Sequence, residues 1–134
     1  MNWQSKKIFF LLIITIIFIG NACRKVTKYT APDISSPVIK ISTPVKNGLQ
    51  NSINPISIVG TALDNDLASL DVNVFNVTDT IKLYTESQVI SGTGVTIQQN
   101  FSKFVTKPTS CLLEVVVKDK AGNRSADSTY FNIY

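Results

Sequence analysis

The sequence predicts an all-β fold, a Greek-key β-sandwich of about seven strands, after an N-terminal signal helix and an extended tether. Two features of the chain beyond residue 36 predict the sandwich. Apolar residues recur at every second position in short runs, which is the period of half-buried strands. Clusters of Gly, Asn, Asp and Ser separate these runs and are typical of turns. Short alternating strands between turns form the pattern that two packed sheets require.

The predicted strands follow one another with clear boundaries. The first lies between Pro37 and Pro44, the second ends at Gly60, and the fifth follows the loop 91–94. The fifth also contains one polar exception, Gln99, at an otherwise apolar position. In chain order, the residues that define the seven strands are Ile39 and Ile41; Ile56 and Ile58; Leu70, Val72 and Val74; Ile81 and Leu83; Val95, Ile97 and Phe101; Leu113, Val115 and Val117; and Phe131 and Ile133.

Two turns indicate how the strands connect. The segment 119–125 places Gly122 and Asn123 where a tight turn needs positive φ, so it predicts a hairpin between the last two strands. The segment 61–66 is expected to do the same between the second and third strands. We therefore expect strands that are neighbours along the chain to pair with each other.

The start of the chain has the pattern of a secretory leader. Lys6 and Lys7 precede an apolar run, Ile8–Ile19, of 12 residues. A membrane-spanning helix needs roughly 20 residues, whereas the core of a signal peptide needs about 7–15. The run is followed by small residues and Cys23, an ending that resembles the lipobox of bacterial lipoproteins. Gly20 stands where a Leu-like residue is usual, and such looser boxes are typical of Bacteroidota.

The lipobox resemblance implies a signal peptide over 1–22 and a lipidated Cys23 as the first mature residue. An ordinary secreted protein and an uncleaved anchor are the alternatives. Residues 24–36 have no periodic apolar pattern and contain Thr, Ser and Pro. We therefore expect the lipidated cysteine and a flexible tether over 23–36, and the β-sandwich over 37–134.

A family resemblance supports the sandwich. The segments 37–39, 58–64, 70–74 and 117–125 resemble those of bacterial immunoglobulin-like domains in surface and periplasmic proteins. Together with the leader, the chain is similar to single-domain immunoglobulin-like lipoproteins of Bacteroidota. The resemblance implies an immunoglobulin-like strand order, but the fold hosts many roles and implies no activity.

Composition argues against several functions. From Ala31 onwards there are eight basic and nine acidic residues, so the +4 charge of the whole chain belongs to its start. A basic surface for nucleic acid is not expected. The chain contains no histidine, which removes Ser/His/Asp and Cys/His catalysis, and Glu114 falls on the solvent side of its strand. We therefore expect no enzymatic activity. Cys111 shares the parity of the apolar residues that follow it, which favours a buried core position over a reactive thiol.

Three groups of polar residues are candidate sites. Asp64, Asp66 and Asp119 follow the second and sixth strands, and their oxygens suit calcium, although Asp also favours tight turns for structural reasons. The segments 79–81 and 127–129, with Thr80 and Ser128 as acceptors, resemble the Asp-Ser/Thr-apolar site of Bacteroidota protein O-glycosylation. Tyr130, Asn132 and Tyr134 lie on the outward parity of the last strand and would form a contact patch if that strand is an edge; ordinary sheet surface is the alternative.

These features together predict a lipid-anchored module of the cell envelope that binds or helps to assemble another envelope protein, without catalysis. The alternative is an accessory lipoprotein that binds a glycan or calcium. Surface-exported lipoproteins of Bacteroidota often have acidic residues after the cysteine, whereas Arg24 and Lys25 follow Cys23 here. This difference favours the periplasmic face of the outer membrane.

Overall fold

The computed structural model describes residues 30–134, and Pro32–Tyr134 form one compact unit. The predicted leader, Cys23 and the first part of the tether lie outside these residues. The described part of the chain is all-β, and no helix able to cross a membrane is found in it. Its eight strands are β1 (Val38–Thr43), β2 (Gly48–Gln50), β3 (Ile56–Leu63), β4 (Leu67–Asn76), β5 (Lys82–Val89), β6 (Gly94–Phe101), β7 (Thr109–Asp119) and β8 (Arg124–Ile133).

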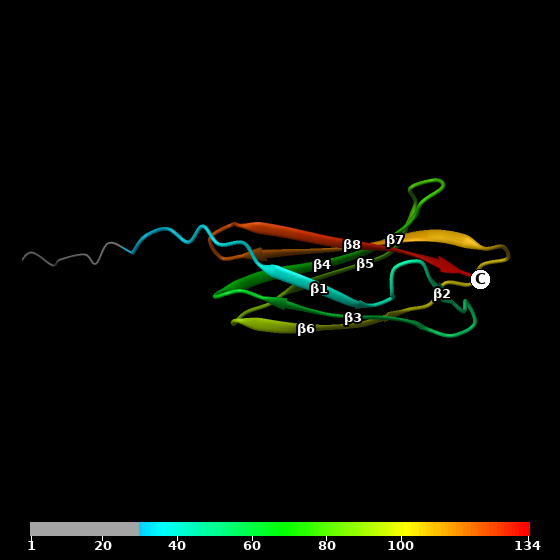
Figure 1. Ribbon diagram of the computed structural model, residues 1–134, viewed down its shortest axis with the longest axis horizontal. Helices are drawn as coiled ribbons and strands as arrows, with labels where there is room; N and C mark the ends of the chain where they lie inside the picture. Colours follow the sequence, from blue (N-terminus) through cyan, green and yellow to red (C-terminus); the bar gives the residue numbers. More distant parts are fainter. Residues whose placement is uncertain (1–29) are drawn as a thin grey trace, which may run out of the picture. The chain divides into compact units, whose positions relative to one another are not determined.

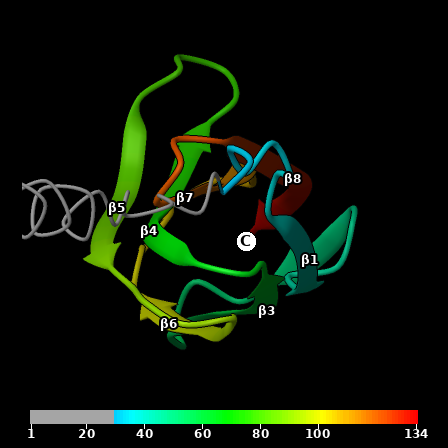
Figure 2. The same cartoon turned by 90° about the vertical axis from the view of Figure 1, so that its left-hand side faces the viewer.

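The strands form two sheets that pack face to face (Figures 1 and 2). One sheet has the order β1-β3-β6 and the other the order β2-β8-β7-β4-β5. All pairs are antiparallel except β2 with β8, which is parallel. The chain changes sheet at every connection except β4–β5 and β7–β8. This is a Greek-key sandwich with an immunoglobulin-like strand order, so the predicted fold class is confirmed.

The core lies between the sheets and contains the residues that alternate in the sequence. Each sheet turns one face inward because successive side chains of a strand point to opposite faces. The burial of these side chains supplies the main driving force for folding, roughly 1.5–3 kcal/mol for each large aliphatic residue. The most deeply buried large residues are Ile56, Ile58, Leu67, Leu70, Val72, Val74, Ile97, Leu113, Val115, Val117, Phe131 and Ile133.

The structure contains one strand, β2, that was not among the seven predicted strands. It has three residues, and its one apolar side chain, Leu49, is 70% exposed, so it leaves no alternating pattern to recognise. Its pairing with Phe131–Ile133 of β8 fixes it instead. The backbone extends the pairing, because Asn47 N donates a hydrogen bond to Tyr130 O at 2.7 Å.

The prediction of a hairpin between the second and third strands, β3 and β4, is wrong. The two strands belong to different sheets, and the segment 64–66 carries the chain across the core. This crossing is held by the neighbouring β5–β6 loop, since Asp64 N donates to Thr93 O at 3.0 Å and Leu67 N donates to Gly92 O at 2.9 Å. The predicted β7–β8 hairpin is confirmed, and Gly122 in its turn has φ +93°.

Candidate functional site

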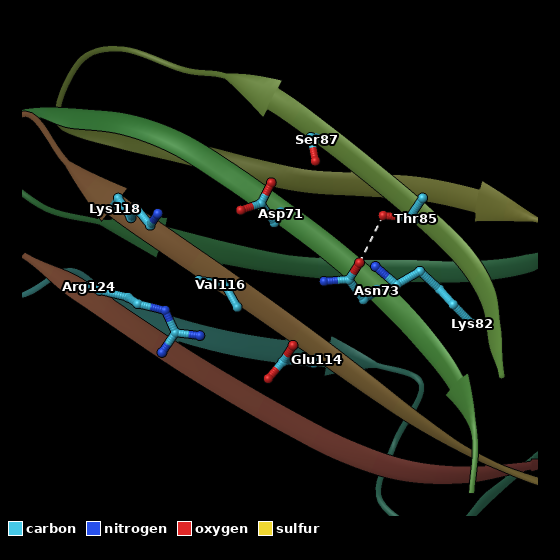
Figure 3. A pocket seen from close by; sticks show the side chains of 9 residues that line it. All are labelled: Asp71, Asn73, Lys82, Thr85, Ser87, Glu114, Val116, Lys118 and Arg124. Atoms are coloured by element: carbon cyan, nitrogen blue, oxygen red, sulfur yellow. Dashed lines mark hydrogen bonds between the residues drawn. The ribbon is translucent and has the colours of Figure 1, made fainter. Parts of the chain in front are cut away.

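A polar groove lies on the outer face of the five-stranded sheet, the face turned away from the core (Figure 3). It has a volume of about 360 Å³. Inside it Thr85 Oγ1 of β5 donates a hydrogen bond to Asn73 Oδ1 of β4 at 2.8 Å. The groove contains both acidic and basic side chains, so it offers donors and acceptors in neighbouring positions. Its lining residues are Asp71, Asn73, Lys82, Thr85, Ser87, Glu114, Val116, Lys118 and Arg124.

An apolar groove of about 410 Å³ adjoins the polar one and shares Glu114 with it. Phe75, Leu112 and Tyr130 line this second groove in register across β4, β7 and β8. The Nζ atom of Lys82 lies 5.5 Å from the ring centre of Phe75, which is within cation–π range. The outer face therefore changes from charged to apolar along the strands.

The three residues of the predicted contact patch have different environments in the structure. Tyr130 is 50% exposed and lines the apolar groove. Asn132 Oδ1 accepts a hydrogen bond from Ser110 Oγ of β7 at 2.7 Å. Tyr134 pairs with the segment around β2, since its backbone N donates to Gln50 O at 3.0 Å. The prediction required the last strand to be an edge of its sheet. β8 is instead flanked by β7 and β2, so this requirement is not met.

A carboxylate cluster lies at the end of the sandwich where the domain begins. It consists of Asp33, Asp66 and Asp119, each with a carboxylate oxygen within 4.8 Å of the others. Asp119 is 3% exposed, and its two carboxylate oxygens accept hydrogen bonds from Asn123 N and Nδ2, both at 2.7 Å. The Oδ1 atom of Asp66 is buried and has no hydrogen-bond partner among the described residues.

The cluster contains two of the three predicted calcium ligands and adds a third residue. Asp33 takes the place that the sequence analysis gave to Asp64. Ser35 Oγ donates a hydrogen bond to Asp33 Oδ1 at 2.6 Å, and with a second bond from Ser35 N it lowers the pKa of the Asp33 carboxyl. Asp64 lies in the β3–β4 connection outside the cluster, with its Oδ2 buried and without a hydrogen-bond partner. Asp33 precedes the first strand, in a segment without periodic apolar residues, so the sequence analysis did not identify it as a candidate ligand.

The other candidate residues occupy contrasting environments. Thr80 is exposed at the β4–β5 turn and has φ +56°, and it lines the apolar groove. Ser128 is exposed on β8, directly opposite Glu114. Cys111 is fully buried, as predicted, and its burial raises the pKa of the thiol to about 11. A protonated, inaccessible thiol is a poor nucleophile.

No protein-family model matches this chain, and no curated protein sequence is significantly similar to it. The candidate sites therefore rest on the geometry described above.

Proposed function

We propose that the chain is a lipid-anchored binding module of the cell envelope without catalytic activity, and that its partner is another envelope protein. The lipid would be carried by Cys23, and Arg24 and Lys25 after it favour the periplasmic face of the outer membrane. The proposed contact surface is the outer face of the five-stranded sheet.

One observation carries this proposal, namely that the polar and apolar grooves adjoin on one face and share Glu114. Protein interfaces typically combine aromatic and apolar residues with a polar rim, and Tyr and Arg are enriched at their energetic centres. Here Tyr130 lies at the apolar end of the face and Arg124 at the charged end. The absence of histidine from the sequence agrees with a role in binding.

The test is a mild-detergent pull-down of the tagged full chain from native envelopes, with mass spectrometry of its mature N-terminus. Tyr130→Ala and Glu114→Lys should each lose the captured protein, and Cys23→Ser should lose both the acyl group and the capture. Thr61, exposed on the outer side of β3, supplies the matched controls Thr61→Ala and Thr61→Lys. Capture that is equal in all four sheet variants would refute the proposed surface, and an unmodified N-terminus would refute the anchor. Binding in a polysaccharide panel that Tyr130→Ala abolishes would identify a glycan ligand instead.

A second candidate function is calcium binding by the carboxylate cluster. The specific observation is the buried Oδ1 of Asp66, which has no hydrogen-bond partner although it belongs to a group of three carboxylates. Calcium prefers six to eight oxygen ligands, which three carboxylates and nearby carbonyls can supply. A cation there would connect the segment before β1 with the ends of both sheets.

The measurement is thermal unfolding of the soluble domain in millimolar CaCl₂ and in chelator. A bound ion raises the midpoint because it binds the folded state only. Equal midpoints in calcium and chelator would reject this function, and an equal response to magnesium would indicate general charge screening.

A further inference from the structure

The free edge of β6 lacks the features that protect most edge strands. β6 pairs with β3 on one side and ends the three-stranded sheet on the other. Its eight residues include no charged residue and no proline, and its register against β3 runs from Gly94 to Phe101 without a bulge. Thr96, Gln98 and Asn100 are its exposed outward residues. Such an edge presents unpaired backbone groups in a regular row.

The other edges of the two sheets are protected. β1 contains Lys40 and has a register shift between Ile41 and Thr43. β5 contains Lys82 and Glu86. β2 has three residues only. Charges, bulges and short length are among the ways in which proteins prevent unwanted strand pairing, and β6 has none of these three.

The two sheets differ in size, with three and five strands, and the smaller sheet ends at β6. β5 and β6 end their sheets on the same side of the molecule (Figure 2), where the ring of Tyr84 stacks on Phe101 at 5.4 Å between centres. Tyr84 and Glu86 lie opposite the buried Val74 and Val72, so they share the inward face of β5. Both are half-buried, because the three-stranded sheet stops at β6.

Glu86 is the charged residue on the inward face of β5. Burial, and then the negative charge of Glu86, raise the pKa of the Tyr84 hydroxyl. Tyr84 OH also lies 3.5 Å from Gln99 Oε1 of β6, so the same tyrosine closes the gap between the two sheets. A strand added beside β6 would cover Tyr84 and face Glu86.

We propose that the free edge of β6 binds an extended segment of another protein as a fourth strand of the three-stranded sheet. The segment would form backbone hydrogen bonds to β6. Its inward side chains would be apolar next to Tyr84, with one basic residue facing Glu86. Its outward side chains would be neutral and polar, like Thr96, Gln98 and Asn100. This site is separate from the outer face of the five-stranded sheet, so it does not depend on the proposed function.

The probe is a synthetic peptide of the same length as β6, with Val at inward positions, Gln or Thr at outward positions and one Lys in place of a central Val. Hydrogen exchange of the domain measures its effect. We expect the peptide to slow exchange of β6 amides at least about tenfold and to leave β1 and β5 unchanged. The same peptide N-methylated along one edge should have no effect, because it cannot form the strand hydrogen bonds.

Two residues of the domain give a matched pair of variants. Thr96 on β6 and Thr61 on β3 are directly paired, exposed and identical in type, but only Thr96 is on the edge. Thr96→Lys should weaken peptide binding at least about tenfold, whereas Thr61→Lys should leave it unchanged. Glu86→Gln should remove the preference for the Lys peptide over one with Val at that position.

Absence of binding, protection at an edge other than β6, or equal binding of the methylated peptide would each overturn the proposal. Equal effects of the two threonine variants would do the same. Circular dichroism melting of each variant confirms that the domain is folded.

Discussion

Asn123 Nδ2 donates a hydrogen bond to the backbone carbonyl oxygen of Asp33 at 3.1 Å, across 90 positions of sequence. The same nitrogen donates to the buried carboxylate of Asp119 at 2.7 Å. One amide side chain thus connects the β7–β8 turn, the carboxylate cluster and the segment before the first strand.

Asn123→Ala should destabilise the domain by about 1.5–3 kcal/mol, because it removes a side-chain hydrogen bond to a buried carboxylate. Urea unfolding measures this change. Asn54→Ala is the control, since Asn54 is exposed, and it should change stability by less than about 0.5 kcal/mol. Similar losses in both variants would show that the Asn123 side chain has no special role.

Asp66→Asn should have opposite effects in chelator and in calcium. It removes one of three neighbouring negative charges, so in chelator it should stabilise the domain by about 1 kcal/mol. It also removes a calcium ligand, so the rise in midpoint with calcium should be lost. Asp71→Asn, on the outer face of the five-stranded sheet, is the control and should keep the calcium response. A destabilised Asp66→Asn in chelator would contradict charge repulsion within the cluster.

Thr80→Asn should stabilise the domain by about 0.5–1 kcal/mol. Thr80 has φ +56°, a region that disfavours β-branched side chains and that Asn tolerates. Thermal unfolding compared with Thr78→Asn, in the same turn, isolates the backbone effect. The intact masses of the native protein and of Thr80→Asn also test for glycosylation at this residue. A sugar attached to Thr80 would add mass to the native protein and would be absent from the variant.

Gly60→Ala should destabilise the domain by about 1–3 kcal/mol, the usual range for overpacking. A Cβ atom on Gly60 would lie 2.6 Å from the backbone oxygen of Lys40 in the neighbouring strand β1. Gly94→Ala should cost less, because its new Cβ would meet the flexible end of the Leu63 side chain. Denaturant unfolding of both variants gives the comparison, and an equal cost would refute the assigned cause.

The buried thiol of Cys111 should make stability depend on pH at high pH. Burial raises its pKa from 9 to about 11, so between these values the unfolded chain releases a proton that the folded domain keeps. This contribution to the free energy of unfolding is complete below pH 9 and is lost as pH rises toward 11. The free energy of unfolding of the native chain should therefore fall more steeply over this pH range than the free energy of unfolding of Cys111→Ala. Parallel curves for the two chains would exclude the thiol as the cause.

The strands that could be located most fully from sequence are those with at least three apolar residues at successive inward positions. β4 and β7 have such residues, and their alternation gave both their position and their inward face. β8 was predicted only around Phe131 and Ile133, because its earlier inward residues, such as Asp127 and Thr129, are polar and half-buried. The failed β3–β4 hairpin has a similar origin, since alternation shows which side of a strand is buried but not which strand lies beside it.

The candidate sites depend on which strands and loops lie side by side, and the alternation of apolar residues does not show this. Asp66 and Asp119 were predicted from their place in loops, but Asp33 joins them through contacts of the chain before β1, where no periodic pattern exists. The grooves of the outer face are formed by side chains of four strands, whose order follows from the sheet topology. Glu114 was placed on the outward side of its strand by parity, yet its neighbours Asn73 and Ser128 are brought to it by register alone.

The parallel pairing of β2 with β8 has a mechanical consequence. β2 lies early in the domain and β8 is its last strand, so tension between the two chain ends pulls the paired strands past each other in opposite directions. The hydrogen bonds between Gly48–Gln50 and Phe131–Ile133 then carry the load together, in shear, instead of opening one after another. Tyr134 adds to this seam, because its carbonyl accepts a bond from Ser52 N at 2.8 Å. Pulling the two ends of the domain apart would therefore require this seam to break as a unit.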